Sequence, residues 1–335
     1  MENKKTPIGF IIGRFQPLHP GHKEFIRQAA KASEQLIIFV GSSNKASDIK
    51  NPWSFEERRS TISHFLDHED IKNVAVVPLN DYKYNDPQWI TDIVSYIESL
   101  GFNPDDVTVF GHTKNDTGYL QWFPSYRYKE ISTNINISAT EVRQKLFDSR
   151  HPSMPSKVLD DYDYFQKEAE RFSVYPYPET LNFNCSDIIV ECNSHILLIQ
   201  RKFAPGAGNW ALPGGFKNRN ETFMDCAIRE LFEETNLRVP EKVIRGSVVS
   251  TQLFDSPTRA AAGIPRNTFC VHVKIKAEAD GSLPRANGAD DAAECKWVSL
   301  YDALNNYVLH DDHKDLLSTM TGVMPIPAHL NSRFN

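Results

Sequence analysis

The chain reads GFKNRNETFMDCAIRELFEETNL from Gly215 to Leu237. On a helix, Glu230, Glu233 and Glu234 stand at positions i, i+3 and i+4, so that three carboxylates crowd one face. Like charges at this spacing repel one another, and hard divalent cations such as Mg²⁺ prefer carboxylate oxygens as ligands. Taken alone, this spacing favours a solvated acidic face, which is what most glutamate clusters on helices are.

Other features of the same stretch favour a functional site over a solvated face. The residues 213–215, Pro-Gly-Gly, supply a tight turn just before it. The apolar residues Phe223, Ala227 and Leu231 recur at i, i+4 and i+8, which gives the helix a stripe to bury. Arg229 stands beside the acids, where its charge can orient one of them.

The stretch resembles the Nudix hydrolase signature, in which a Gly, a Glu, an Arg-Glu pair and a Glu-Glu pair recur at fixed spacing. The matching positions are Gly215, Glu221, Arg229, Glu230, Leu231, Glu233, Glu234 and Leu237. Asn236 replaces the final Gly, and this is a small departure because Asn is the next most tolerant residue in the left-handed conformation that ends such a helix. The resemblance implies an α/β/α fold with a mixed sheet.

It also implies metal-assisted cleavage of a nucleoside diphosphate derivative. Glu230, Glu233 and Glu234 are expected to hold Mg²⁺, with Mn²⁺ as an alternative, and Glu233 is expected to be catalytic. The cations would polarise the pyrophosphate and lower the pKa of a bound water. Glu221 is expected to hold an outer-shell water or to order the loop. A further acid often completes such sites; the candidates are Asp290, Asp291 and Glu294, for each of which a solvated loop charge is the favoured alternative.

Composition limits the class of protein. A length of 335 residues accommodates two domains, and 40% hydrophobic residues are enough for ordinary cores. The net charge of −6 provides no diffuse basic field that would recruit nucleic acid. We expect no membrane span, no signal peptide and reduced thiols at the five scattered cysteines, hence a cytoplasmic protein. No oligomeric state follows from the sequence.

The order of elements predicts an N-terminal α/β domain at residues 1–150. Strands are expected at residues 8–12, 36–40, 74–78 and 107–110, and helices at 22–34, 54–68, 87–100 and 139–148. This alternation predicts a Rossmann-like, doubly wound parallel sheet. A linker is expected at residues 151–180, with a charged helix at 160–171. The second domain, residues 181–335, is expected to have strands at 186–192, 195–201, 243–254, 268–277 and 295–300.

The first predicted strand runs into GRFQPLHPGH, residues 13–22. In an open parallel sheet this is the carboxyl edge, where ligands bind. A helix that starts near Gly21 offers backbone N–H groups to an anion, and Arg14, His19 and His22 can add charge and donors. The stretch therefore predicts a phosphate site, with helix capping or packing as the alternative role of the histidines.

These residues resemble the HxGH nucleotidyltransferase superfamily. Residues 137–143, ISATEVR, resemble its second motif, ISxTxxR. Ser138 and Glu141 have capping-box spacing, which predicts a helix that starts at Ser138. Thr140 and Arg143 on its first turn are expected to hold a triphosphate tail. The resemblance implies that His19, His22 and Arg143 are catalytic and that Gly13, Arg14, Phe15, Ser138 and Thr140 bind substrate.

Within that superfamily, the N-terminal residues look most like archaeal-type nicotinamide mononucleotide (NMN) adenylyltransferases. The run at 13–22, residues 51–58 and Trp89 carry this resemblance. It implies that ATP and NMN give NAD and pyrophosphate, and that Trp89 stacks on the nicotinamide ring; helix packing is the alternative for Trp89. Nicotinic acid mononucleotide, phosphopantetheine or FMN remain alternative acceptors.

The substrate of the second domain is expected to be ADP-ribose. Residues 254–259 and Arg266 resemble a loop of the ADP-ribose branch of the Nudix family, in part only, and Arg259 is expected to bind substrate. The expected products are AMP and ribose 5-phosphate. Other nucleoside diphosphate derivatives are an alternative, as is a sensor that binds ADP-ribose without cleaving it.

Overall fold

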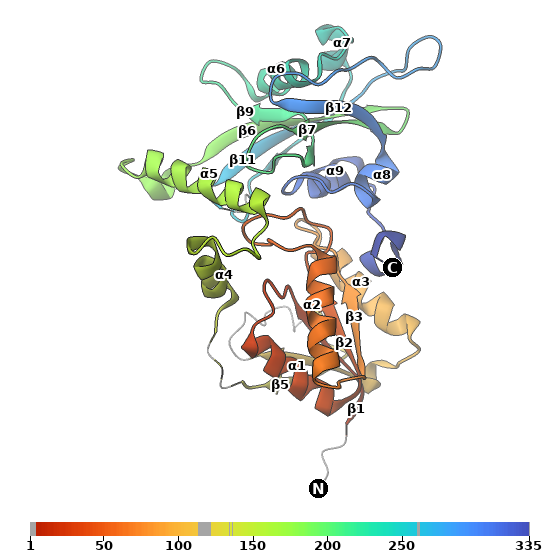
Figure 1. Ribbon diagram of the computed structural model, residues 1–335. Helices are drawn as coiled ribbons and strands as arrows, with labels where there is room; N and C mark the ends of the chain where they lie inside the picture. The colour runs from red at the N-terminus through yellow and green to blue at the C-terminus, as the bar shows by residue number, and fades with distance from the viewer. Residues whose placement is uncertain (1–4, 113–121, 134, 136, 260–261, 335) are drawn as a thin grey trace. The chain divides into compact units, whose positions relative to one another are not determined.

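The computed structural model describes residues 5–112, 122–133, 135, 137–259 and 262–334 (Figure 1). The chain forms two compact units. Unit 1 comprises Met1–Asn44, Asn51–Met154 and Pro327–Asn335, and unit 2 comprises Lys45–Lys50 and Pro155–Ile326. Two boundaries differ from those expected: most of the expected linker belongs to unit 2, and the end of the chain belongs to unit 1. Within the described part of the chain, every helix is too short or too polar to span a bilayer.

Unit 1 is built on a sheet of parallel strands, in the order β3-β2-β1-β4-β5 among the described residues. The strands are β1 (Thr6–Gly13), β2 (Ser33–Val40), β3 (Val74–Pro78), β4 (Val107–His112) and β5 (Arg127–Ile131). The helices are α1 (Pro20–Ala32), α2 (Phe55–His68), α3 (Asp86–Ser99) and α4 (Ala139–Asp148). The strand order reverses between β1 and β4, which makes their carboxyl ends the switch point where ligands bind in such sheets.

Helices cover both faces of this sheet, as the alternation of side chains along a strand requires. On one face Ile11 of β1 packs with Phe25 of α1 and Ile62 of α2. On the other face the adjacent Phe10 packs with Ile93 of α3. The expected doubly wound parallel sheet is therefore confirmed.

Three local features of unit 1 differ from expectation. α1 ends at Ala32, two residues early, because Ser33 is extended and already begins β2. β5 was not expected, since its sequence, RYKEI, is exposed except at its last residue and has no apolar alternation. Ser138 does precede α4, but its side chain makes no capping hydrogen bond.

Unit 2 is built on a mixed sheet with the order β10-β11-β6-β7-β12, in which β9 also pairs with β6 and β8 with β7. The strands are β6 (Phe183–Cys192), β7 (His195–Arg201), β8 (Trp210–Ala211), β9 (Gly214–Phe216), β10 (Val248–Phe254), β11 (Arg266–Lys274) and β12 (Ala292–Ser299). The helices are α5 (Ser156–Phe172), α6 (Phe223–Thr235), α7 (Glu241–Gly246), α8 (Leu300–Asn305) and α9 (His313–Thr321). β6 and β11 are parallel, and the other pairs are antiparallel.

α6 is the helix expected from the acidic run. A capping box between Thr222 and Asp225 starts it, and Ala227 and Leu231 are fully buried in the core of unit 2. It ends at Asn236, whose φ of 44° and ψ of 35° are left-handed. The expected helix end is therefore confirmed, with Asn in place of Gly.

Two stretches of unit 2 differ from expectation. Residues 243–247 were expected to be part of a strand, but they lie in α7 and the turn after it. Pro240, with φ of −60°, precedes this helix, and Ile244 is buried. α5 is not an isolated linker helix: the carboxylate of Asp161 accepts from the Gly206 N–H at 2.8 Å, and that of Glu168 accepts from Arg266 at 2.5 Å.

Candidate functional sites

The first site lies where β1 and β2 end. Phe15, just after β1, has a left-handed φ of 52° and is buried. Arg58 of α2 is 3% exposed, and it donates to the carbonyls of Arg14 at 2.8 Å and Gly41 at 2.7 Å. Burial lowers the pKa of Arg58 to about 10. This buried cation fixes the loop after each strand, and its role could not be inferred from a motif.

The two histidines of the motif lie together at the start of α1. His19 is the N-cap, and its Nδ1 accepts from the backbone N–H of His22 at 3.4 Å. The two rings stack, with centroids 3.7 Å apart, and the ring of Phe15 meets His22 edge-on at 5.0 Å. Capping and packing thus coexist with an imidazole pair held at a helix N-terminus, where anions bind well.

The second motif reaches the first through Arg143. This side chain is 7% exposed and donates to the backbone carbonyl of Gln16 at 2.5 Å and to Thr140 Oγ1 at 3.2 Å. The side-chain amide of Gln16 in turn donates to the carbonyl of Trp53 at 2.9 Å. The structure therefore brings Arg143 to the GRFQP loop, while Ser138 and Thr140 are exposed.

Trp89 packs within unit 1. Its ring lies edge-on to Trp122 at 6.0 Å and tilted against Phe123 at 6.1 Å, and it is partly buried against the core under α3. These contacts favour the packing role. Asp81, just after β3, joins two strand ends: its carboxylate accepts from Ser42 Oγ at 2.6 Å and from the Ser42 N–H at 3.0 Å.

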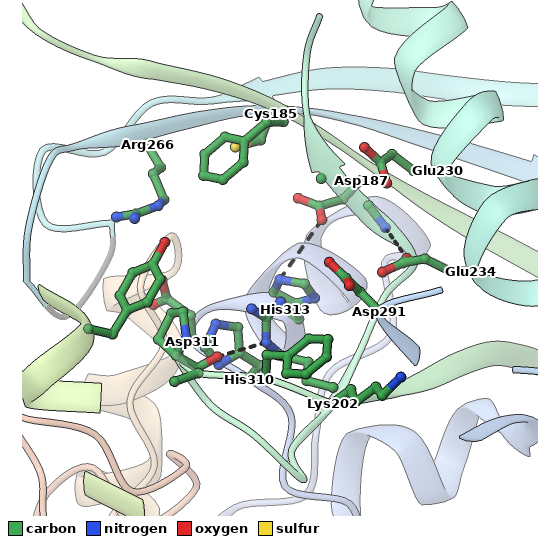
Figure 2. Close-up of a pocket in the computed structure, with 18 of the residues that line it drawn as sticks. Cys185, Asp187, Lys202, Glu230, Glu234, Arg266, Asp291, His310, Asp311 and His313 are labelled. Atoms are coloured by element: carbon green, nitrogen blue, oxygen red, sulfur yellow. Dashed lines mark hydrogen bonds and ion pairs between the residues drawn. The ribbon is translucent and has the colours of Figure 1, made fainter. Parts of the chain in front are cut away.

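The second site is a cavity of about 450 Å³ in unit 2, shown in Figure 2. Its lining includes the carboxylates of Asp187, Glu230, Glu234, Asp291 and Asp311, the cations Arg201, Lys202, Arg229, Arg259 and Arg266, and His310 and His313. The volume lies within the range typical of small-molecule sites. The acidic helix α6 thus faces a cavity and not only solvent.

Arg229 organises the acidic face of α6. It donates to Glu221 at 2.8 and 3.0 Å, to Glu230 at 2.8 Å and to Glu233 at 2.8 Å. This pairing lowers the pKa of Glu221 to about 2. Glu233 is 45% exposed and lies outside the cavity lining.

Glu234 and Glu230 are the acids that face inward. Burial raises the pKa of Glu234 to about 8, and the nearby charge of Glu230 adds to the shift. Burial also raises the pKa of Glu230. The carboxylate of Glu234 accepts from the Gly214 N–H at 2.9 Å, and a Cβ at Gly215 would lie 2.6 Å from a Glu230 oxygen. Only a residue without a side chain leaves this space open.

A divalent cation would take its ligands from the carboxylates at this end of the cavity. Among the described residues, no three His, Cys, Asp or Glu side chains converge closely enough to hold one. Arg229 donates to both Glu230 and Glu233, so two acids of the expected trio are paired with this arginine. Glu230 and Glu234 nevertheless have the oxygen donors that Mg²⁺ and Mn²⁺ prefer, and a bound cation would stabilise the carboxylate charge that burial disfavours. The donor chemistry of this pair fits the metal.

Arg259, expected to bind substrate, lies in the cavity wall within a buried network. It is 6% exposed and donates to Asp312 at 3.0 Å and to Asp187 at 3.4 Å. Asp187 also accepts from Thr268 at 2.6 Å. Asp187 and Asp312 were missed because no local motif marks them; they come from β6 and from the turn before α9.

Of the three candidates for a further acid, Asp291 lines the cavity. In Figure 2 it lies near Glu234. Its backbone carbonyl accepts from the Lys202 N–H at 3.0 Å, which ties the loop before β12 to the end of β7. Asp290 and Glu294 are exposed and lie outside the cavity lining.

Comparisons with known proteins agree with this division. Residues 10–145 match the cytidylyltransferase-like family model, and residues 185–320 match the NUDIX domain model. A nicotinamide/nicotinic acid mononucleotide adenylyltransferase of Acinetobacter baylyi is 32% identical over 42% of this chain and 75% of the relative. A nicotinamide-nucleotide adenylyltransferase of Methanococcus maripaludis is 30% identical over 51% of this chain and 98% of the relative. Fold and sites thus define a nucleotidyltransferase combined with a Nudix hydrolase.

A solved structure matches almost the whole chain. The crystal structure of a bifunctional NMN adenylyltransferase/ADP ribose pyrophosphatase from Francisella tularensis has 30% identity and a TM-score of 0.85, over 95% of this chain and 99% of that chain. A second structure of that protein, complexed with AMP and a Mn ion, has a TM-score of 0.83 at the same identity and coverage. The chain belongs to this family of bifunctional enzymes.

Proposed function

We propose that the chain makes NAD and pyrophosphate from NMN and ATP in unit 1 and hydrolyses ADP-ribose to AMP and ribose 5-phosphate in unit 2. The observation that carries the proposal is the likeness to the Francisella enzyme over 95% of the chain, with His19, His22 and Arg143 in unit 1 and the acids of α6 in unit 2. The relatives named for nicotinamide nucleotides support the first activity.

In unit 1 the reaction needs no protein nucleophile. A phosphate oxygen of NMN attacks the α-phosphorus of ATP, the bond to the β-phosphate oxygen breaks, and pyrophosphate leaves with that electron pair. His19 and His22 at the start of α1 donate to the α-phosphate oxygens and stabilise the charge that develops there. Arg14, exposed beside them, binds the phosphate tail. Arg143 positions the loop through the Gln16 carbonyl.

In unit 2 a water oxygen attacks one phosphorus of ADP-ribose, the bridging P–O bond breaks, and the water protons end on the two phosphate products. Glu230 and Glu234 would hold Mg²⁺, which supplies, when bound, a polarised pyrophosphate and a water of lowered pKa. Glu233 keeps Arg229 in place. Arg259, Arg201 and Lys202 line the cavity and provide positive charge for the phosphates.

The proposal is tested by product identification on the purified chain. One reaction contains NMN, ATP and Mg²⁺, and we expect NAD and pyrophosphate. A parallel reaction contains nicotinic acid mononucleotide, because one relative is named for both acceptors. A third contains ADP-ribose and Mg²⁺, and we expect AMP and ribose 5-phosphate. Binding of ADP-ribose without turnover would overturn the second activity and indicate a sensor.

A reducing, cytoplasmic environment suits this assignment. All five cysteines are free thiols. Burial raises the pKa of Cys185 and of Cys295 to about 12, so both thiols stay protonated and unreactive at neutral pH.

A further inference from the structure

Residues 45–50 belong to the first family match by sequence and to unit 2 by structure. They fall inside residues 10–145, which match the cytidylyltransferase-like model, yet they are part of the compact unit that holds the hydrolase site. In the chain they lie between β2 and α2. The hydrolase unit therefore includes a short segment that comes from outside the range matched by the NUDIX model.

This segment lies behind the wall of the hydrolase cavity. It lines a small pocket of about 50 Å³ with its residues Lys45, Ala46, Ser47 and Asp48. Four residues line both this pocket and the large cavity, namely Pro205, Arg266, His310 and Asp311. Three of these, Arg266, His310 and Asp311, are labelled around the large cavity in Figure 2. The segment thus supports one wall of the cavity from the side that faces away from the α6 acids.

An ion pair with α9 anchors the segment. Lys45 Nζ donates to Asp315 Oδ2 at 2.5 Å, and the two side chains are only 16% and 7% exposed. When one partner of such a buried pair is removed, the charge of the other is left uncompensated, which is strongly unfavourable. Lys45 is therefore a counter-charge on which the buried carboxylate of Asp315 depends.

The end of α9 that Lys45 contacts also holds the cavity wall. The helix begins at His313, which lines the cavity. Asp312 is its N-cap residue and accepts from Arg259 Nε at 3.0 Å. Asp315 occupies the third position of the helix, and the side chains at the N-cap and at this position are neighbours in space. Two carboxylates therefore stand together on the first turn of α9.

Each of these carboxylates is paired with a cation. Arg259 pairs with Asp312, and Lys45 pairs with Asp315. Without Lys45, the two carboxylates would repel each other and compete for the guanidinium of Arg259. Arg259 is a cation of the cavity wall that would bind the substrate phosphates, so a change in its position would weaken substrate binding.

We propose that Lys45 is a positioning residue of the hydrolase site, which acts through Asp315 to fix the first turn of α9 and, with it, Arg259. The inference rests on the hydrolytic function proposed above. A residue from the sequence range of the nucleotidyltransferase thus serves the second activity. Because Lys45 acts on Arg259 and not on the α6 acids, its loss should raise KM more than it lowers kcat.

The test is the steady-state hydrolysis of ADP-ribose by the full chain. Lys45→Met keeps the length of the side chain without its charge. It should raise KM by about ten-fold, within the losses that a small displacement of a binding group can cause, while kcat changes less than about two-fold. Lys45→Arg keeps the charge and should behave like the wild type.

A double variant separates charge from packing. Lys45→Met combined with Asp315→Leu removes both charges, and the replacement of a buried ion pair by apolar groups is often neutral. KM should therefore return to nearly the wild-type value. Lys50→Met is the matched control, since Lys50 is exposed at the end of the same segment and lies outside the lining of both cavities. It should leave KM for ADP-ribose unchanged.

Three results would overturn the inference alone: an unchanged KM in Lys45→Met, a raised KM that persists in the double variant, or a fall in kcat as large as the rise in KM. The last two would show a general packing defect in place of a charge effect on Arg259. A wild-type chain that does not hydrolyse ADP-ribose would overturn the proposed hydrolysis and this inference together.

Discussion

The two sites of the chain handle phosphate in opposite ways. In unit 1 the charged side chains near the motif are bound to protein carbonyls: Arg58 to Arg14 and Gly41, and Arg143 to Gln16. These two cations hold the backbone of the loops in place, and the loops present backbone N–H groups and imidazole rings to a ligand. In unit 2, acidic side chains are crowded and buried, and their pKa values rise.

The difference follows from what each reaction needs. A site that joins two phosphorylated substrates must reduce their mutual repulsion, so a rigid loop with donors and positive charge is suitable. A site that cleaves a pyrophosphate with water needs a charged metal, and carboxylates are its ligands. Mutations should therefore affect the two activities separately, and four of them sharpen the comparison.

The largest effect is expected at Glu234. Glu234→Gln removes a buried carboxylate that lines the cavity and should lower ADP-ribose hydrolysis by about a thousand-fold, the loss typical of one key electrostatic group. NAD formation should be unchanged. Glu241→Gln, on the surface of α7 with its side chain 55% exposed, is the control. Hydrolysis at the normal rate in Glu234→Gln would contradict the role that we give to the carboxylates of unit 2.

His22→Ala should produce the reverse pattern. Loss of one donor to the α-phosphate should lower NAD formation by a few hundred-fold, on the order of magnitude seen for such donors, and should leave ADP-ribose hydrolysis intact. His64→Ala, an exposed residue of α2, should change neither rate. Both rates are measured on the same preparation, and equal losses of both activities in His22→Ala would show that the two sites are not separable.

Arg58→Ala tests the structural use of cations in unit 1. The carbonyls of Arg14 and Gly41 would lose a buried donor, and we expect a loss of about 2 kcal/mol in the unfolding free energy of unit 1. Denaturant unfolding followed in unit 1 gives this value. The neighbouring Arg59, exposed and bonded to the Phe334 carbonyl at 3.0 Å, is the control. A larger loss in Arg59→Ala would contradict the role given to Arg58.

The smallest effect is expected at the end of α6. Asn236→Gly restores the signature residue at a left-handed position and should stabilise unit 2 by less than about 1 kcal/mol, with hydrolysis unchanged. Asn236→Ala should instead destabilise it by about 1 kcal/mol, because an L-residue without a polar side chain is strained there. Thermal unfolding of both variants checks the sign, and stabilisation by Ala would contradict it.

Local patterns predicted most elements of the chain. The bounds of β3, α4 and β7 agree with those inferred from periodicity and caps. β5 was not predicted because an exposed edge strand has no apolar alternation. The helical state of residues 243–247 was not predicted because a helix of six residues is too short to show a 3.6-residue period. In both cases, contacts with neighbouring elements decide whether the segment is a strand or a helix.

The sites were predicted only as far as their motifs extend. Glu230, Glu234, His19 and His22 could be found because the spacing along a helix or loop is a local property. The partners that orient the motif residues, such as Asp187 and Asp312 beside Arg259, are distant in sequence and carry no signal of their own. The sequence indicated that Arg229 could orient one of the acids, but spacing does not show that it bonds to Glu221, Glu230 and Glu233 together.

The last residues of the chain have a consequence for its synthesis. Ala328 and Phe334 are buried in the core of unit 1, and the Phe334 ring lies 5.5 Å from Phe55 of α2. During translation, residues 327–335 of unit 1 are therefore synthesised only after all of unit 2. A chain cut before residue 327 would lose these core contacts of unit 1 and keep every residue of unit 2, so we expect such a cut to destabilise the nucleotidyltransferase unit first.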